Sequence, residues 1–444
     1  MFSYLMSHIS NLFKMKHIIT SLALLAVCQF SFGQANVYPA KPQNKAIAII
    51  GATIHTGTGQ VIETGYITFD QGKITGMGDA RVVKFNSDTY QMISASGKHI
   101  YPGFIAPITN LGLIETSAIR ATLDYDEVGN MNPHIRSIIA YNTDSKVPNT
   151  LRTNGVLLAH ITPKGGLISG QSSVVELDGW NWEDAAYKTD LAINMNWPGS
   201  QISGSPFALP AETQKENTLK ALRELELYFA EAKTYTELSK PEVSNSRFNA
   251  MKGLFNGSKK LIVNADNSKD IIAAVNFFKG MGITPVIAGA TDAHLITVFL
   301  KDNNVSVIIN KPHSLPSKDD DDVYLPYKQA KILSDAGINF AISIDGYWQQ
   351  RNLPFMAGTA AAYGLTKEQA LATITLNAAK ILGIDKTVGS LEIGKDATLF
   401  ISAGDALDMM SNDVEQAFIR GKNIDLDNLH KQLFKRYSEK YEGK

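Results

Sequence analysis

The sequence predicts an α/β fold in which a small β domain accompanies a barrel of parallel strands, and three observations predict it. Residues 45–97 are rich in β-branched side chains interrupted by turn residues, a pattern typical of short strands. From residue 100 onward, apolar runs of strand length alternate with helical patterns. Two more strand patterns follow residue 388. Repeated strand–helix units imply a parallel sheet, and eight such units close a barrel.

The first β segment contains short strands separated by glycine-containing turns. The turns are expected at residues 57–59 and 70–72. The strands are expected at Ala46–Ile50, Val61–Phe69 and Lys73–Met77.

The barrel segment supplies about six clear strand–helix units. The expected strands include Leu157–Ile161, Leu261–Ala265, Thr284–Ala288, Val305–Ile309 and Phe340–Ile344. Helices are expected at Lys215–Lys233, Ser268–Met281, Ala290–Asp302 and Pro326–Ala336. Residues 164–206 lack this pattern, and we expect long loops or an inserted hairpin at the barrel mouth there.

The C-terminal part begins with an amphipathic helix expected at Lys367–Ile381. Thr366 precedes it as a capping residue, and Gly383 ends it. Strands at Ala397–Ile401 and Glu415–Arg420 follow, and a charged helix is expected at Leu426–Tyr441.

Composition excludes several function classes. The net charge is −1 with both signs spread along the chain, and no stretch resembles a basic patch for nucleic acid. Residues 1–34 resemble a secretory signal, whose start is expected at Met15, and the mature chain is expected to contain no transmembrane helix. We therefore expect export to a bacterial periplasm or another extracytoplasmic space. The single cysteine, Cys28, lies in this leader, and a lipid anchor there is the minority alternative.

One stretch carries a family resemblance. Residues 100–112 read IYPGFIAPITNLG and resemble the first barrel strand of the metal-dependent amidohydrolase superfamily, whose pattern is Pro-Gly, two apolar residues, Asp, then His-x-His. Ala106 stands at the Asp position, and Ile108 and Asn110 stand at the two His positions. Three further stretches, residues 51–74, 364–383 and 389–397, resemble the family's opening hairpin, closing helix and final strand.

The resemblance is strongest to imidazolonepropionase-like amidohydrolases, and it implies a TIM-like (β/α)8 barrel plus a small composite β-sandwich formed by both chain ends. The implied organisation is a sandwich part at residues 44–99, a barrel at 100–387, a second sandwich part at 388–424 and a terminal helix at 425–444.

Family members hold one or two divalent metals at the C-terminal mouth of the barrel, with imidazole and carboxylate ligands suited to zinc. The resemblance places Asn264 and Gly289 at two further positions where histidine is usual. Asp345 matches the aspartate that ends the eighth strand. We interpret Asp345 either as the catalytic carboxylate or as a group that holds loop amides.

Other residues offer an unconventional site. His160, Asp266 and His313 are candidates to line the mouth with Asp345, and zinc is expected only if such a set exists. For His160, which lies in an apolar strand, the alternative is a hydrogen-bonded core residue.

Three functions follow from these observations. The resemblance implies a hydrolase acting on carbon–nitrogen bonds of a cyclic amide or small peptide. The missing histidines favour a catalytically inactive homologue that partners a metal-complete paralogue, or a module that binds a small molecule or small peptide. A homo-oligomer, or a hetero-oligomer with a related amidohydrolase, is the expected assembly.

Overall fold

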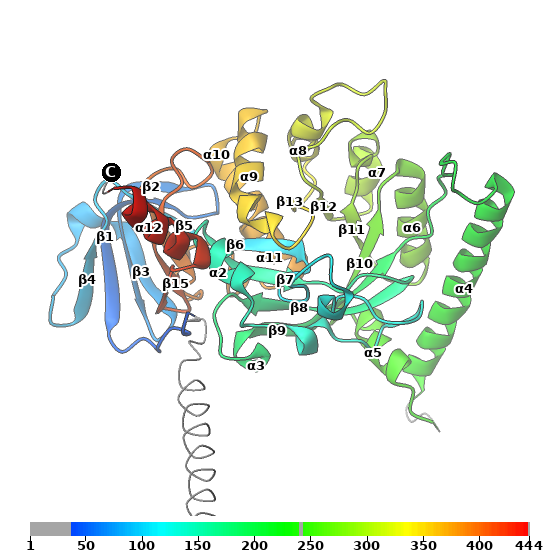
Figure 1. Cartoon of the computed structure of the whole chain (residues 1–444), viewed down its shortest axis with the longest axis horizontal. Coiled ribbons are helices and arrows are strands. Elements are labelled where there is room, and N and C mark those ends of the chain that lie inside the picture. Colours follow the sequence, from blue (N-terminus) through cyan, green and yellow to red (C-terminus); the bar gives the residue numbers. More distant parts are fainter. Residues whose placement is uncertain (1–36, 239–242, 443–444) are drawn as a thin grey trace, which may run out of the picture. The chain divides into compact units, whose positions relative to one another are not determined.

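The computed structural model describes residues 37–238 and 243–442. The predicted leader lies outside the described residues. Figure 1 shows two sheets and the helices around them. No helix in the described ranges is long and apolar enough to cross a membrane.

The first sheet joins strands from both ends of the chain. Its order is β16-β15-β14-β5-β1-β2-β3, with β4 paired to β1. The strands are β1 Ala46–His55, β2 Val61–Asp70, β3 Lys73–Asp79, β4 Tyr90–Ser94, β5 His99–Pro102, β14 Leu399–Ser402, β15 Val414–Ile419 and β16 Lys422–Ile424.

This sheet encloses a separate apolar core in which side chains from both chain ends meet, among them Ile54, Phe69, Leu399 and Phe418. Strands from both chain ends therefore share one sheet and one apolar core. The strands form one hydrogen-bonded sheet, and its packing as a sandwich stays a prediction.

The second sheet is the barrel wall, in the order β13-β12-β11-β10-β9-β8-β7-β6. The expectation of a TIM-like barrel is confirmed. The strands are β6 Phe104–Thr109, β7 Val156–Ile161, β8 Ile168–Glu176, β9 Ala186–Asn196, β10 Lys260–Ala265, β11 Val286–Gly289, β12 Val307–Ile309 and β13 Phe340–Ile342.

Helices cover the outside of this wall (Figure 1). They are α2 Lys146–Arg152, α4 Ala211–Glu237, α5 Ser246–Phe255, α6 Ser268–Gly280, α7 Thr297–Asp302, α8 Leu325–Asp335, α9 Leu353–Ala362, α10 Lys367–Thr373 and α11 Leu376–Leu382. A short helix α3, Trp182–Ala185, lies between β8 and β9, and α12, Leu429–Tyr441, ends the described chain.

One part of the barrel differs from the expected repeat. Strand β8 runs antiparallel to both β7 and β9, whereas the other neighbouring strands pair in parallel. The segment expected to form loops or an inserted hairpin is therefore largely barrel wall. The reversal needs a tight turn, which Gly165 and Gly166 supply with positive φ of 83° and 59°.

The expected helix at Lys367–Ile381 is divided into α10 and α11. The capping box is present, because the Thr366 and Gln369 side chains each bond the other residue's backbone. The helix breaks at Ile374, whose carbonyl accepts a hydrogen bond from the Ile105 amide of β6 at 2.8 Å. The Ile105 amide of the edge strand β6 thus occupies a carbonyl that would otherwise accept a hydrogen bond within the helix.

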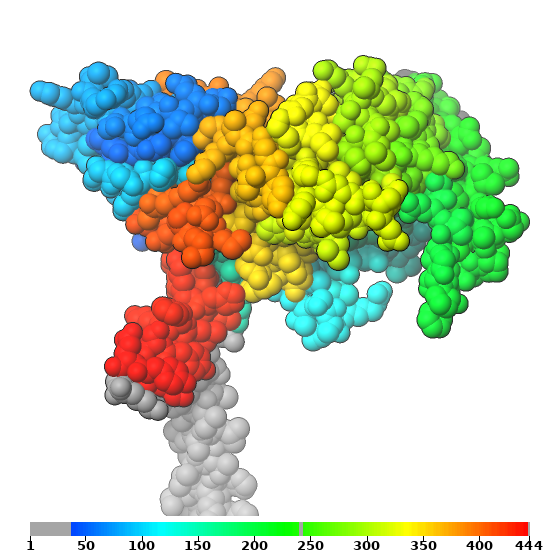
Figure 2. All heavy atoms as spheres, turned by 90° about the horizontal axis from the view of Figure 1, so that it is seen from above, coloured from blue at the N-terminus to red at the C-terminus, as the bar shows by residue number. Residues whose placement is uncertain are grey.

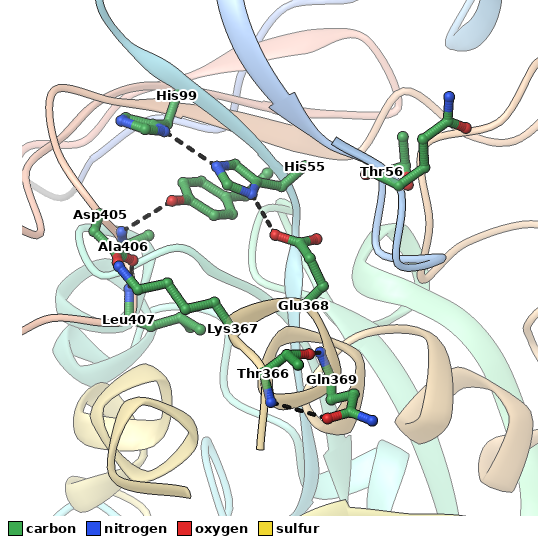
Figure 3. Close-up of polar contacts among 12 residues, drawn as sticks. His55, Thr56, His99, Thr366, Lys367, Glu368, Gln369, Asp405, Ala406 and Leu407 are labelled. Atoms are coloured by element: carbon green, nitrogen blue, oxygen red, sulfur yellow. Dashed lines mark hydrogen bonds and ion pairs between the residues drawn. The ribbon is translucent and has the colours of Figure 1, made fainter. Parts of the chain in front are cut away.

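The strand sheet contacts helix α10 through a polar cluster (Figure 3). His55 Nδ1 lies 2.6 Å from Glu368 Oε1, and His55 Nε2 lies 3.1 Å from His99 Nδ1. The His55 ring stacks on Tyr101 with 4.3 Å between centroids. Lys367 pairs with Asp405 at 2.6 Å. These contacts fix the strand sheet against the barrel.

Aromatic packing continues this contact into the barrel, and it gives the first prediction. Phe400 is fully buried and lies 4.9 Å from Phe104 between ring centroids. Phe400→Ala is expected to lower the free energy of unfolding by about 3–5 kcal/mol, since it leaves a cavity. Chemical denaturation measures the loss. Phe207, which is 99% exposed, provides the control: Phe207→Ala is expected to change stability by less than ~0.5 kcal/mol, and equal losses would contradict the prediction.

Candidate functional site

The main candidate site is a cavity of about 220 Å³ at the mouth of the barrel, where the parallel strands end. Residues at or just beyond the ends of β6, β9, β10, β11, β12 and β13 line it, together with the β7–β8 turn. This is the face on which barrel enzymes place their reactive groups. Because each strand end contributes one or two side chains, the rim gathers residues from distant parts of the sequence.

Most of the residues singled out by sequence meet in this cavity. Ile108, Asn110, Asn264, Asp266, Gly289 and Asp345 all line it. Residues expected at the C-terminal ends of barrel strands therefore do lie around one cavity.

Amide side chains that the sequence did not single out complete the rim. They are Asn194 and Asn196 on β9 and Asn310 directly after β12. Asn310 could have been identified from the sequence, because it directly follows an apolar strand, as Asp345 does. Asn194 and Asn196 were missed because their segment was expected to be irregular. Lys164, in the turn before β8, adds a cation to the lining.

Asp345 is exposed and lies at the end of a short network. Its Oδ1 accepts a hydrogen bond from Asn310 Nδ2 at 2.9 Å, and its Oδ2 lies 3.7 Å from Lys311 Nζ. Both partners lie in the loop after β12, so this loop holds a carboxylate that follows the neighbouring strand β13. In the part of the chain described, no backbone N–H donates a hydrogen bond to the Asp345 side chain. The interpretation that Asp345 holds loop amides is therefore not supported by its contacts.

Asp266 occupies the space beside Gly289. Its Oδ1 accepts a hydrogen bond from Thr291 Oγ1 at 2.8 Å. A Cβ added to Gly289 would lie 2.6 Å from Asp266 Oδ1 and 3.0 Å from Asn264 Oδ1. The two side chains thus fill the volume that a histidine at this position would need.

Asn110 and Asn264 use their amides on the wall. Asn110 is buried, and its Nδ2 donates to the Thr162 carbonyl at 2.8 Å. Asn264 Nδ2 donates to Asn196 Oδ1 at 3.3 Å. Ile108 packs against the barrel core. The two amides therefore link neighbouring segments of the wall.

His160 and His313 do not line the cavity. His160 is fully buried, with Nδ1 2.7 Å from the Pro107 carbonyl and Nε2 2.7 Å from Ser172 Oγ. Both ring nitrogens are therefore used inside the wall, as the core alternative expected. His313 lies in the loop after β12, where it contacts Thr359 and the Tyr327 ring.

These side chains do not fit the zinc site that the resemblance implies. Zinc in catalytic sites takes imidazole, thiolate or carboxylate ligands. The strand positions hold Ile108, Asn110, Asn264 and Gly289, and Asp345 already engages Asn310 and Lys311. No group of three or more His, Cys, Asp or Glu suited to a metal occurs among residues 37–238 and 243–442.

The family model described as "Amidohydrolase family" matches residues 327–424. Imidazolonepropionase from Fusobacterium nucleatum is 23% identical over 366 residues, covering 77% of this chain and 86% of the relative. A 5-methylthioadenosine/S-adenosylhomocysteine deaminase from Moorella thermoacetica is 37% identical over 110 residues, covering 21% and 26%. Imidazolonepropionase from Flavobacterium psychrophilum is 32% identical over 112 residues, covering 23% and 27%. The chain thus spans only about a quarter of the latter two relatives.

Solved structures share the fold. An amidohydrolase from Thermotoga maritima aligns with a TM-score of 0.73 and 20% identity, covering 85% of this chain and 99% of that one. A molinate hydrolase aligns with a TM-score of 0.56 and 13% identity, covering 88% and 96%.

The burial of His160 gives a pH-dependent prediction. Burial lowers the pKa of His160 from 6.5 to about 4. As pH falls below 6.5, His160 takes up a proton in the unfolded chain but stays neutral in the folded chain. The stability that His160 contributes above pH 6.5 is therefore lost as pH falls toward 4. The loss is on the order of 3 kcal/mol. Denaturation of wild type and His160→Gln at pH 7 and pH 4.5 measures it, with the smaller decrease expected for the variant.

A direct readout covers the case in which His160→Gln does not fold. In the wild-type chain, the His160 ring signals in an NMR titration are expected not to move between pH 7 and pH 5. Titration near the ordinary pKa would contradict the buried, neutral ring.

Gly289 gives a prediction with a matched control. Gly289 and Gly282 both have φ +84°, but only Gly289 faces side chains, since nothing lies within 4 Å of a Cβ at Gly282. Gly282→Ala is expected to cost about 1–2 kcal/mol of backbone strain. Gly289→Ala is expected to cost more and to displace Asp266, and Asp266→Ala is expected to remove the excess. Equal losses for the two alanine variants would show that the space beside Gly289 is open.

Proposed function

Because this chain belongs to the amidohydrolase superfamily, we propose that its barrel mouth binds a small amide-type molecule, a cyclic amide or a small peptide, of the kind that carbon–nitrogen hydrolases take. We further propose that the site works without the family's histidine-bound metal. The observation that carries the proposal is the amide-rich lining of the mouth, Asn110, Asn194, Asn196, Asn264 and Asn310.

The chemistry of this lining supports an amide ligand. A primary amide offers both donors and an acceptor, which complement the carbonyl and N–H of another amide. Asn310 and Asn196 are partly exposed, so they remain reachable from the cavity. The volume of about 220 Å³ suits a small molecule. Lys164 and the carboxylates Asp266 and Asp345 supply charges of both signs at the rim.

The donor set supports a site that does not rely on metal-activated water. Isoleucine and glycine have no ligand atom, and an amide oxygen is a weak substitute for imidazole. Asp266 and Asn264 also occupy the space beside Gly289. The histidine positions therefore lack both the ligand atoms and, at Gly289, the room.

Hydrolysis of a carbon–nitrogen bond is a second candidate, which the exposed Asp345 carboxylate favours. In this reaction Asp345 accepts a proton from water as the water oxygen attacks the ligand carbonyl. The C–N bond then breaks, and the nitrogen leaves with the proton that Asp345 returns. Asn310 and Lys311 position the carboxylate for both transfers.

The proposed setting is extracytoplasmic, since it rests on the secretory pattern of residues 1–34. A related, metal-complete amidohydrolase remains the alternative partner, in which case the binding site would act within a hetero-oligomer.

Ligand binding tests the proposal. A panel of cyclic amides and dipeptides is expected to include compounds that raise the melting temperature of the chain. Asn310→Ala is expected to weaken such a compound about two- to tenfold, because it removes one hydrogen bond. Calorimetric titration measures the dissociation constant. The control is Asn86→Ala, an exposed amide in the loop before β4, which is expected to leave the dissociation constant unchanged. Equal affinity for the wild type and Asn310→Ala would contradict binding at the mouth.

Product analysis separates the two candidates. Wild type, Asp345→Asn and Asp335→Asn are incubated with each bound compound, and cleavage is followed by NMR. Hydrolysis requires product from wild type and Asp335→Asn and none from Asp345→Asn, while all three still bind. No product from any of them supports binding alone. If no compound binds and a second barrel protein copurifies with the chain, the partner alternative replaces the proposal.

A further inference from the structure

The C-terminal helix α12 has no part in the function proposed for the barrel mouth. The helix starts cleanly, because Asn428 Oδ1 caps it by accepting from the Lys431 amide at 2.9 Å. None of its residues is buried. Its first turn touches the barrel, where His430 meets the Trp348 ring at 5.4 Å between centroids. In Figure 2 the red C-terminal segment stands out from the body of the barrel.

Apolar side chains form one stripe along this helix. Leu429, Leu433, Tyr437 and Tyr441 recur every four residues, which places them on one face. Phe434 lies beside them and is 76% exposed. Large apolar side chains rarely gather on a surface without a partner. None of these side chains is buried by the segments within residues 37–238 and 243–442.

Basic residues border the stripe. At about 3.6 residues per turn, Arg436 and Lys440 lie along one side of it and Lys431 along the other. Lys435 and Glu439 fall on the opposite face, and Glu442 lies beside Lys431. The helix is therefore basic next to its apolar stripe, although the whole chain has a net charge of −1.

We propose that α12 is an interfacial anchor that lies on the surface of an anionic lipid bilayer. An amphipathic helix with leucine and aromatic residues on one face and lysine or arginine beside them binds at the headgroup boundary. The apolar stripe enters the acyl region, and the bordering cations meet lipid phosphates. At 13 residues, α12 is about 20 Å long and lies in the interface without spanning it.

Charge argues for this occupant over a second copy of the chain. Two α12 helices packed stripe to stripe would bring Arg436, Lys440 and Lys431 of each copy together, and like charges repel. A lipid surface needs no shaped partner, and its negative charge neutralises all three.

Vesicle binding tests the proposal. The chain purified after export carries Cys28→Ser, so that no acyl chain contributes. It is expected to sediment with vesicles that contain phosphatidylglycerol, and much less with pure phosphatidylcholine. Phe434→Ser is expected to lower the partition coefficient about tenfold. The double change Arg436→Glu and Lys440→Glu is expected to lower it at least tenfold at low salt and to remove its salt dependence.

Matched controls lie elsewhere on the surface. Phe207→Ser removes an aromatic side chain that is 99% exposed, and Lys220→Glu reverses an exposed charge on α4. Both are expected to bind as wild type does. The proposal is overturned if the α12 variants bind as tightly as these controls, or if neutral and anionic vesicles bind equally. A dimer in solution that Phe434→Ser dissociates, without vesicle binding, overturns it in favour of a second copy.

Discussion

The barrel depends on how its two edge strands are held together, because β6 and β13 do not pair with each other through backbone hydrogen bonds. The Ile108 carbonyl on β6 accepts from Ser343 Oγ at 3.2 Å and from Gln350 Nε2 at 3.0 Å. Gln350 is fully buried and also donates to the Ile344 carbonyl at 2.6 Å. A buried carbonyl without a partner costs free energy, so these side chains both close the edge and satisfy the backbone.

The closure determines what the mouth looks like. Ser343 and Gln350 fix the end of β13, and Asp345 lies just beyond it. Asn110 lies two residues after Ile108 and joins β6 to the Thr162 carbonyl on the other side. The backbone carbonyl of Ile108 and the side-chain amide of Asn110 therefore both support the wall. At Asn110 the side chain itself holds the strand edge, whereas the Ile108 side chain is apolar and has no ligand atom.

Most polar side chains at the mouth are uncharged amides and hydroxyls, and this limits the reactions that they can promote. Amides can orient a ligand by hydrogen bonding, but they do not supply the concentrated positive charge that lowers the barrier to water attack in metal-assisted hydrolysis. The two carboxylates are anchored, Asp345 by Asn310 and Lys311 and Asp266 by Thr291. The amides of the mouth can thus orient a small molecule, whereas strong polarisation of a carbonyl would need a charge that these amides do not carry.

The sequence by itself determined that apolar strands alternate with helices, because apolar periodicity records which segments are buried. Its family resemblance implied the barrel and placed Asn264, Gly289 and Asp345 at the mouth, and Asp266 follows Asn264 by two residues. Only the tertiary structure decided the direction of β8, since strand polarity depends on which partner a chain meets after the turn at Gly165 and Gly166. It alone assigned His160 to the wall, because whether a ring in an apolar strand faces a cavity depends on neighbours such as Ser172 that pair across the sheet.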